Sequence, residues 1–217
     1  TVNGGTVEME EEVGENAKIN LNGGQLQFGE TLNKNARINV NDGSLILSKV
    51  DKNAKFNLTG GNLDLTGKVE KNANFDIQNA VVNFLGQDLL EENIDVDLEN
   101  GTLNTDGNAV SLASLTLSGN STLDLGNNPL VSVDLGRVDG GGILQVVGYN
   151  ENTSIQFNNN QSSIDSGSQI LFGSTPGMVN DSGNIVPAVP EPSTYFGGGL
   201  LALAAILLEL RRRRKKS

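Results

Sequence analysis

GGQLQFGETLNKNARINVNDGSLILSKVDKNAKFNL, residues 23–58, holds two copies of the pattern that decides the fold. Each copy has a glycine followed by alternating apolar residues, then a short polar turn, then an Asn-Ala pair and a second alternation. Both markers recur every 18 or 19 residues, which indicates a repeat protein. The glycine marker occupies Gly5, Gly24, Gly43 and Gly61, with Ala80 in the next copy, and the pair begins at Asn16, Asn35, Asn53 and Asn72.

The alternation predicts short β-strands with one buried face. Successive side chains of a strand point to opposite sides, so the apolar residues after each marker share one face. One more apolar residue in the middle of each turn is expected to face the interior from a third short strand, at Val13, Leu32, Val50 and Val69. The other residues expected inside are Leu26, Phe28, Ile38, Val40, Leu45, Leu47, Phe56, Leu58, Leu63, Leu65, Phe75 and Ile77.

Strands this short cannot close a core alone, but stacked coils of ~19 residues can. The sequence therefore predicts an all-β fold, a parallel β-helix (β-solenoid) over residues 1–148. We expect the Asn residues of the pairs to stack as a ladder, with amides bonding from coil to coil at a left-handed corner, and the alanines to pack inside that corner. The pattern resembles the autotransporter-associated β-strand repeats of bacterial surface proteins, and the resemblance implies a right-handed β-helix. An 18-residue left-handed β-helix is the alternative, although its third face would be sparse here.

The repeat degrades after Asn79 without vanishing, and alternating stretches continue as far as Val147. Residues 149–186 are Asn/Ser/Gly-rich and are expected to form an irregular β cap, because a solenoid needs an atypical end unit to cover its exposed edge.

The C-terminal residues contain three blocks in an order typical of a targeting signal. A flexible linker with a Pro-Glu-Pro motif is expected at 187–194, a transmembrane helix at 195–210 and a basic cytoplasmic tail at 211–217. The apolar run of 16 residues is about 24 Å long as a helix, slightly short of a bilayer core, and the basic residues can reach the headgroups. Lys and Arg beside a membrane segment stay on the cytoplasmic side, so the body should lie outside. The basic cluster consists of Arg211, Arg212, Arg213, Arg214, Lys215 and Lys216.

These three blocks together resemble the PEP-CTERM sorting signal of bacterial exported proteins. The resemblance implies recognition by an exosortase, a membrane transpeptidase that removes the tail. It also implies export across the inner membrane, a transient inner-membrane anchor and a final place at the cell surface or in the extracellular matrix. The recognition residues would be Val189, Pro190, Glu191, Pro192 and Ser193.

Composition excludes several classes of chemistry. The chain has no Cys and no His, so it has neither thiol chemistry nor an imidazole ligand, and we expect no metal and no cofactor. Six of the 15 basic residues follow Leu210, whereas all 26 acidic residues precede Arg211. Residues 1–210 therefore carry nine basic against 26 acidic residues, a net charge of −17, which argues against nucleic acid as a partner. The chain starts at Thr1 within a repeat unit, so we expect a longer parent with a signal peptide.

Three hypotheses follow. The leading one is a non-catalytic surface or matrix protein, with an adhesin or a polysaccharide-associated protein as its forms. The second is the C-terminal part of a β-helix carbohydrate-active enzyme whose catalytic site lies in a missing N-terminal region. The third is a permanently anchored membrane protein. Asp95 with Asp97, or Asp134 with Asp139, are the candidate catalytic carboxylates, but their alternation with apolar residues favours outward charges that keep a sheet soluble.

Overall fold

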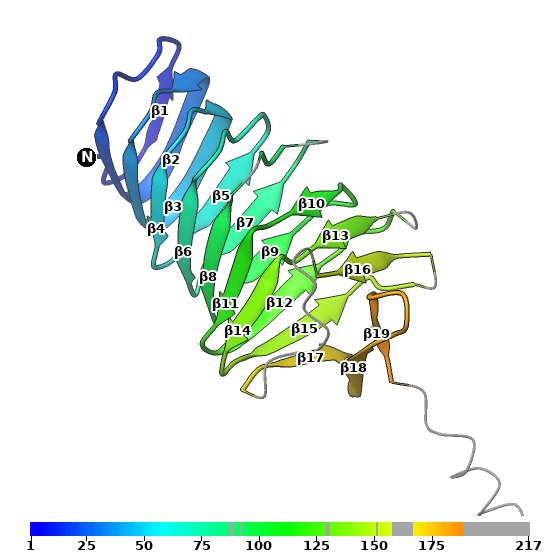
Figure 1. The fold of residues 1–217 in the computed structure, drawn as a ribbon. Coiled ribbons are helices and arrows are strands. Elements are labelled where there is room, and N and C mark those ends of the chain that lie inside the picture. Colours follow the sequence, from blue (N-terminus) through cyan, green and yellow to red (C-terminus); the bar gives the residue numbers. More distant parts are fainter. Residues whose placement is uncertain (87–88, 92, 129–130, 151, 158–166, 189–217) are drawn as a thin grey trace, which may run out of the picture. The chain divides into compact units, whose positions relative to one another are not determined.

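A computed structural model describes residues 1–86, 89–91, 93–128, 131–150, 152–157 and 167–188 of the chain. These residues form β-strands and no helix, and they build a parallel β-solenoid of about eight coils, as the sequence predicts. Residues Thr1–Pro187 make one compact unit, in which the coils follow one another in chain order (Figure 1). Of the second unit, Ala188–Ser217, the described part is Ala188.

Parallel strands form two main faces of the solenoid, and two long strands, β2 (Lys18–Leu32) and β3 (Arg37–Val50), pass from one to the other. The first face holds the opening parts of β2 and β3, then β4 (Lys55–Leu58), β6 (Asn74–Gln78), β8 (Asp95–Glu99), β11 (Ser114–Leu117) and β14 (Arg137–Gly140). The second face holds β1 (Thr6–Met9), the later parts of β2 and β3, β5 (Asn62–Leu65), β7 (Val81–Phe84), β9 (Thr102–Asn104), β12 (Asn120–Asp124), β15 (Ile143–Val147) and β17 (Gln169–Phe172).

The third face starts as a single row of residues and widens into a small sheet. The predicted inward positions pair in parallel from coil to coil, and Leu90 extends the row. Further along the chain, three short strands form a sheet of their own: β10 (Val110–Ser111), β13 (Ser132–Asp134) and β16 (Ser154–Gln156). The prediction that these positions face the interior is confirmed at Leu32, Val50 and Val69, which are fully buried, while Val13 in the first coils is partly buried. Here most of them form single bridges between coils instead of a third strand.

The core consists of the apolar residues that the alternation selects. All twelve residues expected inside from the two main alternations are at most 2 % exposed. Because the strands pair in register, each of them contacts the equivalent residue of the next coil. Phe56 and Phe75 show this most clearly, since their rings stack with centroids 4.6 Å apart and an angle of 3° between planes.

The corner between the first and second faces needs a left-handed residue. In the early coils that residue is glycine, as at Gly43, where φ is 93° and a Cβ would lie 2.4 Å from the carbonyl oxygen of Gly24. In the coil with Ala80 at this position, another residue takes the left-handed conformation. There the left-handed conformation moves back one residue to Asn79, with a φ of 51°, and alanine becomes acceptable.

The end of the unit departs from parallel pairing. Parallel pairs continue through β16 and β17, within the range that the sequence assigns to the cap. β18 (Thr175–Val179) and β19 (Ile185–Pro187) then pair antiparallel, and Ile185 is buried against the core. β19 also lies against β16, where Gln156 bridges to Asn184. This hairpin therefore joins the second face to the third at the end of the stack.

Candidate functional site

The sorting residues predicted from the sequence lie outside the described part of the chain. This applies to Val189, Pro190, Glu191, Pro192 and Ser193, and equally to the basic cluster at 211–216. The predicted transmembrane helix at 195–210 lies there too. Among the described residues, no helix is long and apolar enough to cross a membrane.

The candidate carboxylates Asp95 and Asp97 point outward from β8, as their alternation predicts. Both are exposed, while Val96 between them is buried. The Ser114 hydroxyl donates a 2.5 Å hydrogen bond to Asp95 from the next strand. Asp95 thus accepts a hydrogen bond from a neutral hydroxyl on an open sheet surface. These are the surroundings expected of a charge that keeps the sheet soluble.

Asp134 and Asp139 do not come together. Asp139 lies on β14 of the first face and forms an ion pair with Arg137, whereas Asp134 lies on β13 of the third face. Burial raises the pKa of Asp134, which accepts a 3.0 Å hydrogen bond from the Gly136 N–H. Asp134 lines a hollow of about 210 Å³ together with Leu90, Ala109, Val110, Ser111 and Ser132. None of these neighbours supplies the second carboxyl that glycoside hydrolysis needs.

A row of acidic residues follows the third face on three successive coils, at Asp51, Glu70 and Glu91. The Lys52 N–H, which donates a 2.7 Å hydrogen bond to Asp51, lowers the pKa of that carboxyl. A hydrogen bond with Asp51 raises the pKa of Glu70. Lys68 lies 2.5 Å from the carboxylate of Glu91 and lowers its pKa.

This acidic row is balanced by lysines, not arranged as a metal site. Lys49 lies 3.8 Å from Glu70, and Lys68 neutralises Glu91 in the same way. The part of the chain that the structure describes contains no group of three or more carboxylates placed to hold a metal ion.

The Asn ladder forms as predicted and is longer than predicted. Asn16, Asn35, Asn53 and Asn72 all adopt φ values of 59–61°, and each amide after Asn16 donates a 3.2 Å hydrogen bond to the Oδ1 of the preceding one. Asn93 adds a fifth rung with the same geometry. The alanines behind the ladder at positions 36, 54 and 73 are buried, as expected.

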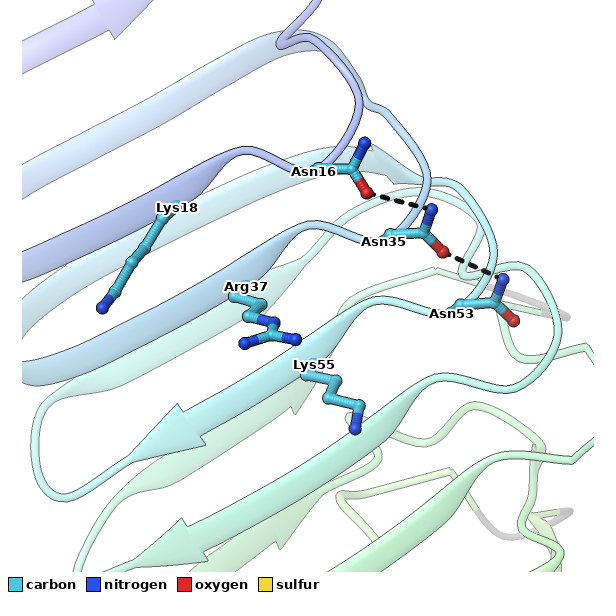
Figure 2. A pocket seen from close by; sticks show the side chains of 6 residues that line it. All are labelled: Asn16, Lys18, Asn35, Arg37, Asn53 and Lys55. Atoms are coloured by element: carbon cyan, nitrogen blue, oxygen red, sulfur yellow. Dashed lines mark hydrogen bonds between the residues drawn. The ribbon is translucent and has the colours of Figure 1, made fainter.

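Three cations stand beside this ladder on the first face, and we call Lys18, Arg37 and Lys55 the basic row. Each follows an Asn of the ladder by two residues, and the strand pairing places them directly opposite one another on β2, β3 and β4. Figure 2 shows the three side chains next to the hydrogen-bonded amides of the ladder. Together they line an open hollow of about 520 Å³, whose lining residues are Asn16, Lys18, Asn35, Arg37, Asn53 and Lys55.

The basic row is unneutralised within the described part of the chain. The ion pairs found there belong to Lys34, Lys49, Lys68 and Arg137. The outward residues on the other side of the row are amides as well, at Asn20, Asn39 and Asn57, and Asn39 donates a 2.6 Å hydrogen bond to Asn20. The part of the first face from the ladder to Asn20, Asn39 and Asn57 therefore presents cations and amides.

Sequence reasoning missed the basic row, although its signal is present in the repeat. The segments NAKIN, NARIN and NAKFN each place a basic residue two positions after the ladder Asn, at residues 18, 37 and 55. The next copy, NANFD, has Asn74 there, so the row ends after three coils.

Comparisons with known proteins give no relative from which a site could be transferred. Neither a protein-family model, nor a curated protein sequence, nor a solved structure matches the chain.

Proposed function

We propose that this chain is an exported, non-catalytic surface or matrix protein that an exosortase sorts and processes through its C-terminal signal. The single observation that carries the proposal is the order of three blocks in the last residues. Pro190, Glu191 and Pro192 precede an apolar run, and six consecutive basic residues follow that run. Proline fixes the backbone and removes hydrogen-bond donors, so a Pro-Glu-Pro sequence disfavours helix and sheet and suits recognition by an enzyme.

Properties of the body support a structural role outside the cell. Its outward-facing rows consist of amide and charged side chains. In several rows the Asn amides donate hydrogen bonds to one another from coil to coil. The chain contains no cysteine, so its stability does not depend on redox conditions. The body is an extended support for repeated, weak surface contacts, which multivalency makes effective.

The winding of the solenoid is part of the proposal. We take the coils to be right-handed, because connections between parallel strands of one sheet are right-handed in ~98 % of cases. The short row on the third face supports this choice over a left-handed helix with three equal faces.

The proposal is tested by expressing the full chain in a bacterium that has an exosortase. Replacing Pro190, Glu191 and Pro192 together with alanine should leave uncleaved chain in the membrane fraction. Pro187→Ala is the matched control, because it removes a nearby proline and leaves the tripeptide intact. Uncleaved protein should accumulate for the triple variant and not for the control. Equal processing of both variants would show that the tripeptide is not a recognition element.

A further inference from the structure

We propose that the basic row is a binding site for a linear carboxylated polysaccharide that lies across the first three coils. This inference rests on the proposed function for the source of the ligand. Its structural basis is the alignment of Lys18, Arg37 and Lys55, which face one another in register on neighbouring strands. Neighbouring strands are ~4.8 Å apart, so the row presents one positive charge per strand along the solenoid.

The alignment has an energetic cost when nothing is bound. Like charges directly opposite one another destabilise a sheet. Like charges also face one another at Asp76 and Asp97, but Lys49 with Glu70 and Lys68 with Glu91 show that the repeat can compensate its charges across coils. The basic row has no such partner, although the chain carries an excess of acids. An external anion would supply the missing compensation.

Amide side chains flank the row on both sides over its three coils. On one side lies the Asn ladder, in which each Nδ2 uses one N–H for the neighbouring rung and retains a second donor. The Arg37 guanidinium offers paired N–H groups that match a carboxylate, and the two lysines add point charges beside it. Cations and amide donors together suit a ligand that has both carboxylates and hydroxyls. A carboxylated polysaccharide carries both groups in every unit.

The shape and extent of the row favour a linear chain over a small molecule. All six lining residues are exposed, and they follow one another on successive strands along the stack (Figure 2). The row is also confined, because the same position holds Asn74 in the fourth coil and Asp95 in the fifth. One ligand of a few units can therefore contact three coils at once, and its weak contacts add.

The acidic body does not prevent such binding at physiological salt. The Debye length there is about 8 Å, and Asp95 lies two strands beyond Lys55. Asp76 lies closer, one strand beyond Lys55 and opposite Asn57, so it offsets part of the charge at Lys55. The equivalent outward positions beside Lys18 and Arg37 hold the amides Asn20 and Asn39.

The test is a calorimetric titration of the full chain, solubilised in a non-ionic detergent, with polygalacturonate at physiological salt. The fully methyl-esterified polymer is the uncharged comparison. The variant K18Q/R37Q/K55Q should bind polygalacturonate about tenfold more weakly, as expected for the loss of three exposed charge pairs. The control variant K49Q/K68Q/R137Q removes the same number of charges from positions away from the row, and its affinity should stay within about a factor of two.

A second measurement covers folding of the variant. Without polymer, K18Q/R37Q/K55Q should unfold at a urea concentration equal to or higher than the wild type, because the like-charge row is relieved. A lower midpoint would mean that the row has an internal partner, and it would overturn the proposal.

Several other results would overturn it. They are equal weakening in both triple variants, equal binding of the methyl ester, and no binding by the wild type. A salt-sensitive dimer that the basic-row variant abolishes without polymer would assign the row to a second copy of the chain. Removal of the tail is a separate readout, so normal processing without polymer binding rejects only this site. Polymer binding by a chain that is never processed rejects the proposed sorting.

Discussion

At the scale of single residues, the left-handed Asn of the ladder fixes the corner from which each coil starts. Asn53 has a φ of 61°, donates to Asn35 and accepts from Asn72. Asparagine tolerates this conformation far better than other residues with a Cβ, and its amide can bond in both directions along the stack. One residue type therefore meets a backbone requirement and a packing requirement together.

These two requirements can be separated by substitution. Asn53→Ala should lower the free energy of unfolding by about 2–3 kcal/mol, because it loses the amide bonds and places alanine in a left-handed conformation. Asn53→Gly should cost only about 1 kcal/mol, since glycine keeps the backbone and loses the amide. Urea denaturation followed by circular dichroism measures both. An alanine variant as stable as the glycine variant would contradict the role given to the backbone.

At the scale of strands and turns, insertions have different effects. The strict alternation makes the strands sensitive to an inserted residue, whereas the turns tolerate one. A one-residue shift moves every later side chain of a strand to the other face. The turns do not have this restriction. Three residues separate Leu65 from Val69, whereas five separate the equivalent Phe84 and Leu90, and both pairs keep their place in the stack.

Insertions should reproduce this difference. Adding Gln-Asp between Gly67 and Lys68 copies the length of the following turn, so the urea midpoint should stay close to that of the wild type. Adding one glycine between Phe56 and Asn57 would turn Asn57 inward and Leu58 outward, at a cost of several kcal/mol. The urea midpoints of the two variants measure the contrast. Similar losses from both insertions would mean that register is not what holds the coils together.

The acidic row on the third face makes a prediction about pH. The raised pKa of Glu70 means that its ionisation disfavours the folded state, an effect that is absent when pH lies below both the folded and unfolded pKa. Glu70→Gln should therefore slightly raise the urea midpoint near pH 7, and the gain should disappear as pH falls through the pKa of Glu70. The effect is small because these side chains are near the surface.

Glu91→Gln is the matched comparison and should have the opposite sign. The pKa of Glu91 is lowered by Lys68, so its charge stabilises the folded state above the unfolded pKa. That variant should lose stability near pH 7, with the loss vanishing at acidic pH. The same sign for both substitutions would contradict the charge arrangement described for this row.

Much of the fold could be predicted because the same sequence pattern occurs in several successive coils. The period fixed which residues align, and the alternation fixed which of them point inward, down to the left-handed Asn53. The antiparallel hairpin of β18 and β19 could not be predicted in the same way, since its pairing depends on contacts that no other coil repeats. Each residue of the basic row is visible in the sequence, but a site follows only from knowing which charges lie opposite on the neighbouring strands. Register alone brings Arg37 between two lysines.

At the scale of the whole molecule, the chain joins an acidic repeat body to a short basic end. Residues 1–210 carry a net charge of −17, and six basic residues follow. The resemblance of the C-terminal blocks to a sorting signal implies a function for this separation of acidic and basic residues. In the proposed function, the basic cluster would orient the chain during export and then be removed, which would leave an acidic solenoid with one basic row near its first coils.

The most direct measurement is the intact mass of the exported protein, isolated from otherwise identical strains with and without an exosortase. We predict that the mature chain from the strain with the enzyme has lost the basic cluster, Arg211 to Lys216, whereas the chain from the strain without it retains the cluster. A mature chain that retains the basic cluster in both strains would contradict the account. It would identify the C-terminal segment as a permanent anchor instead of a processed signal.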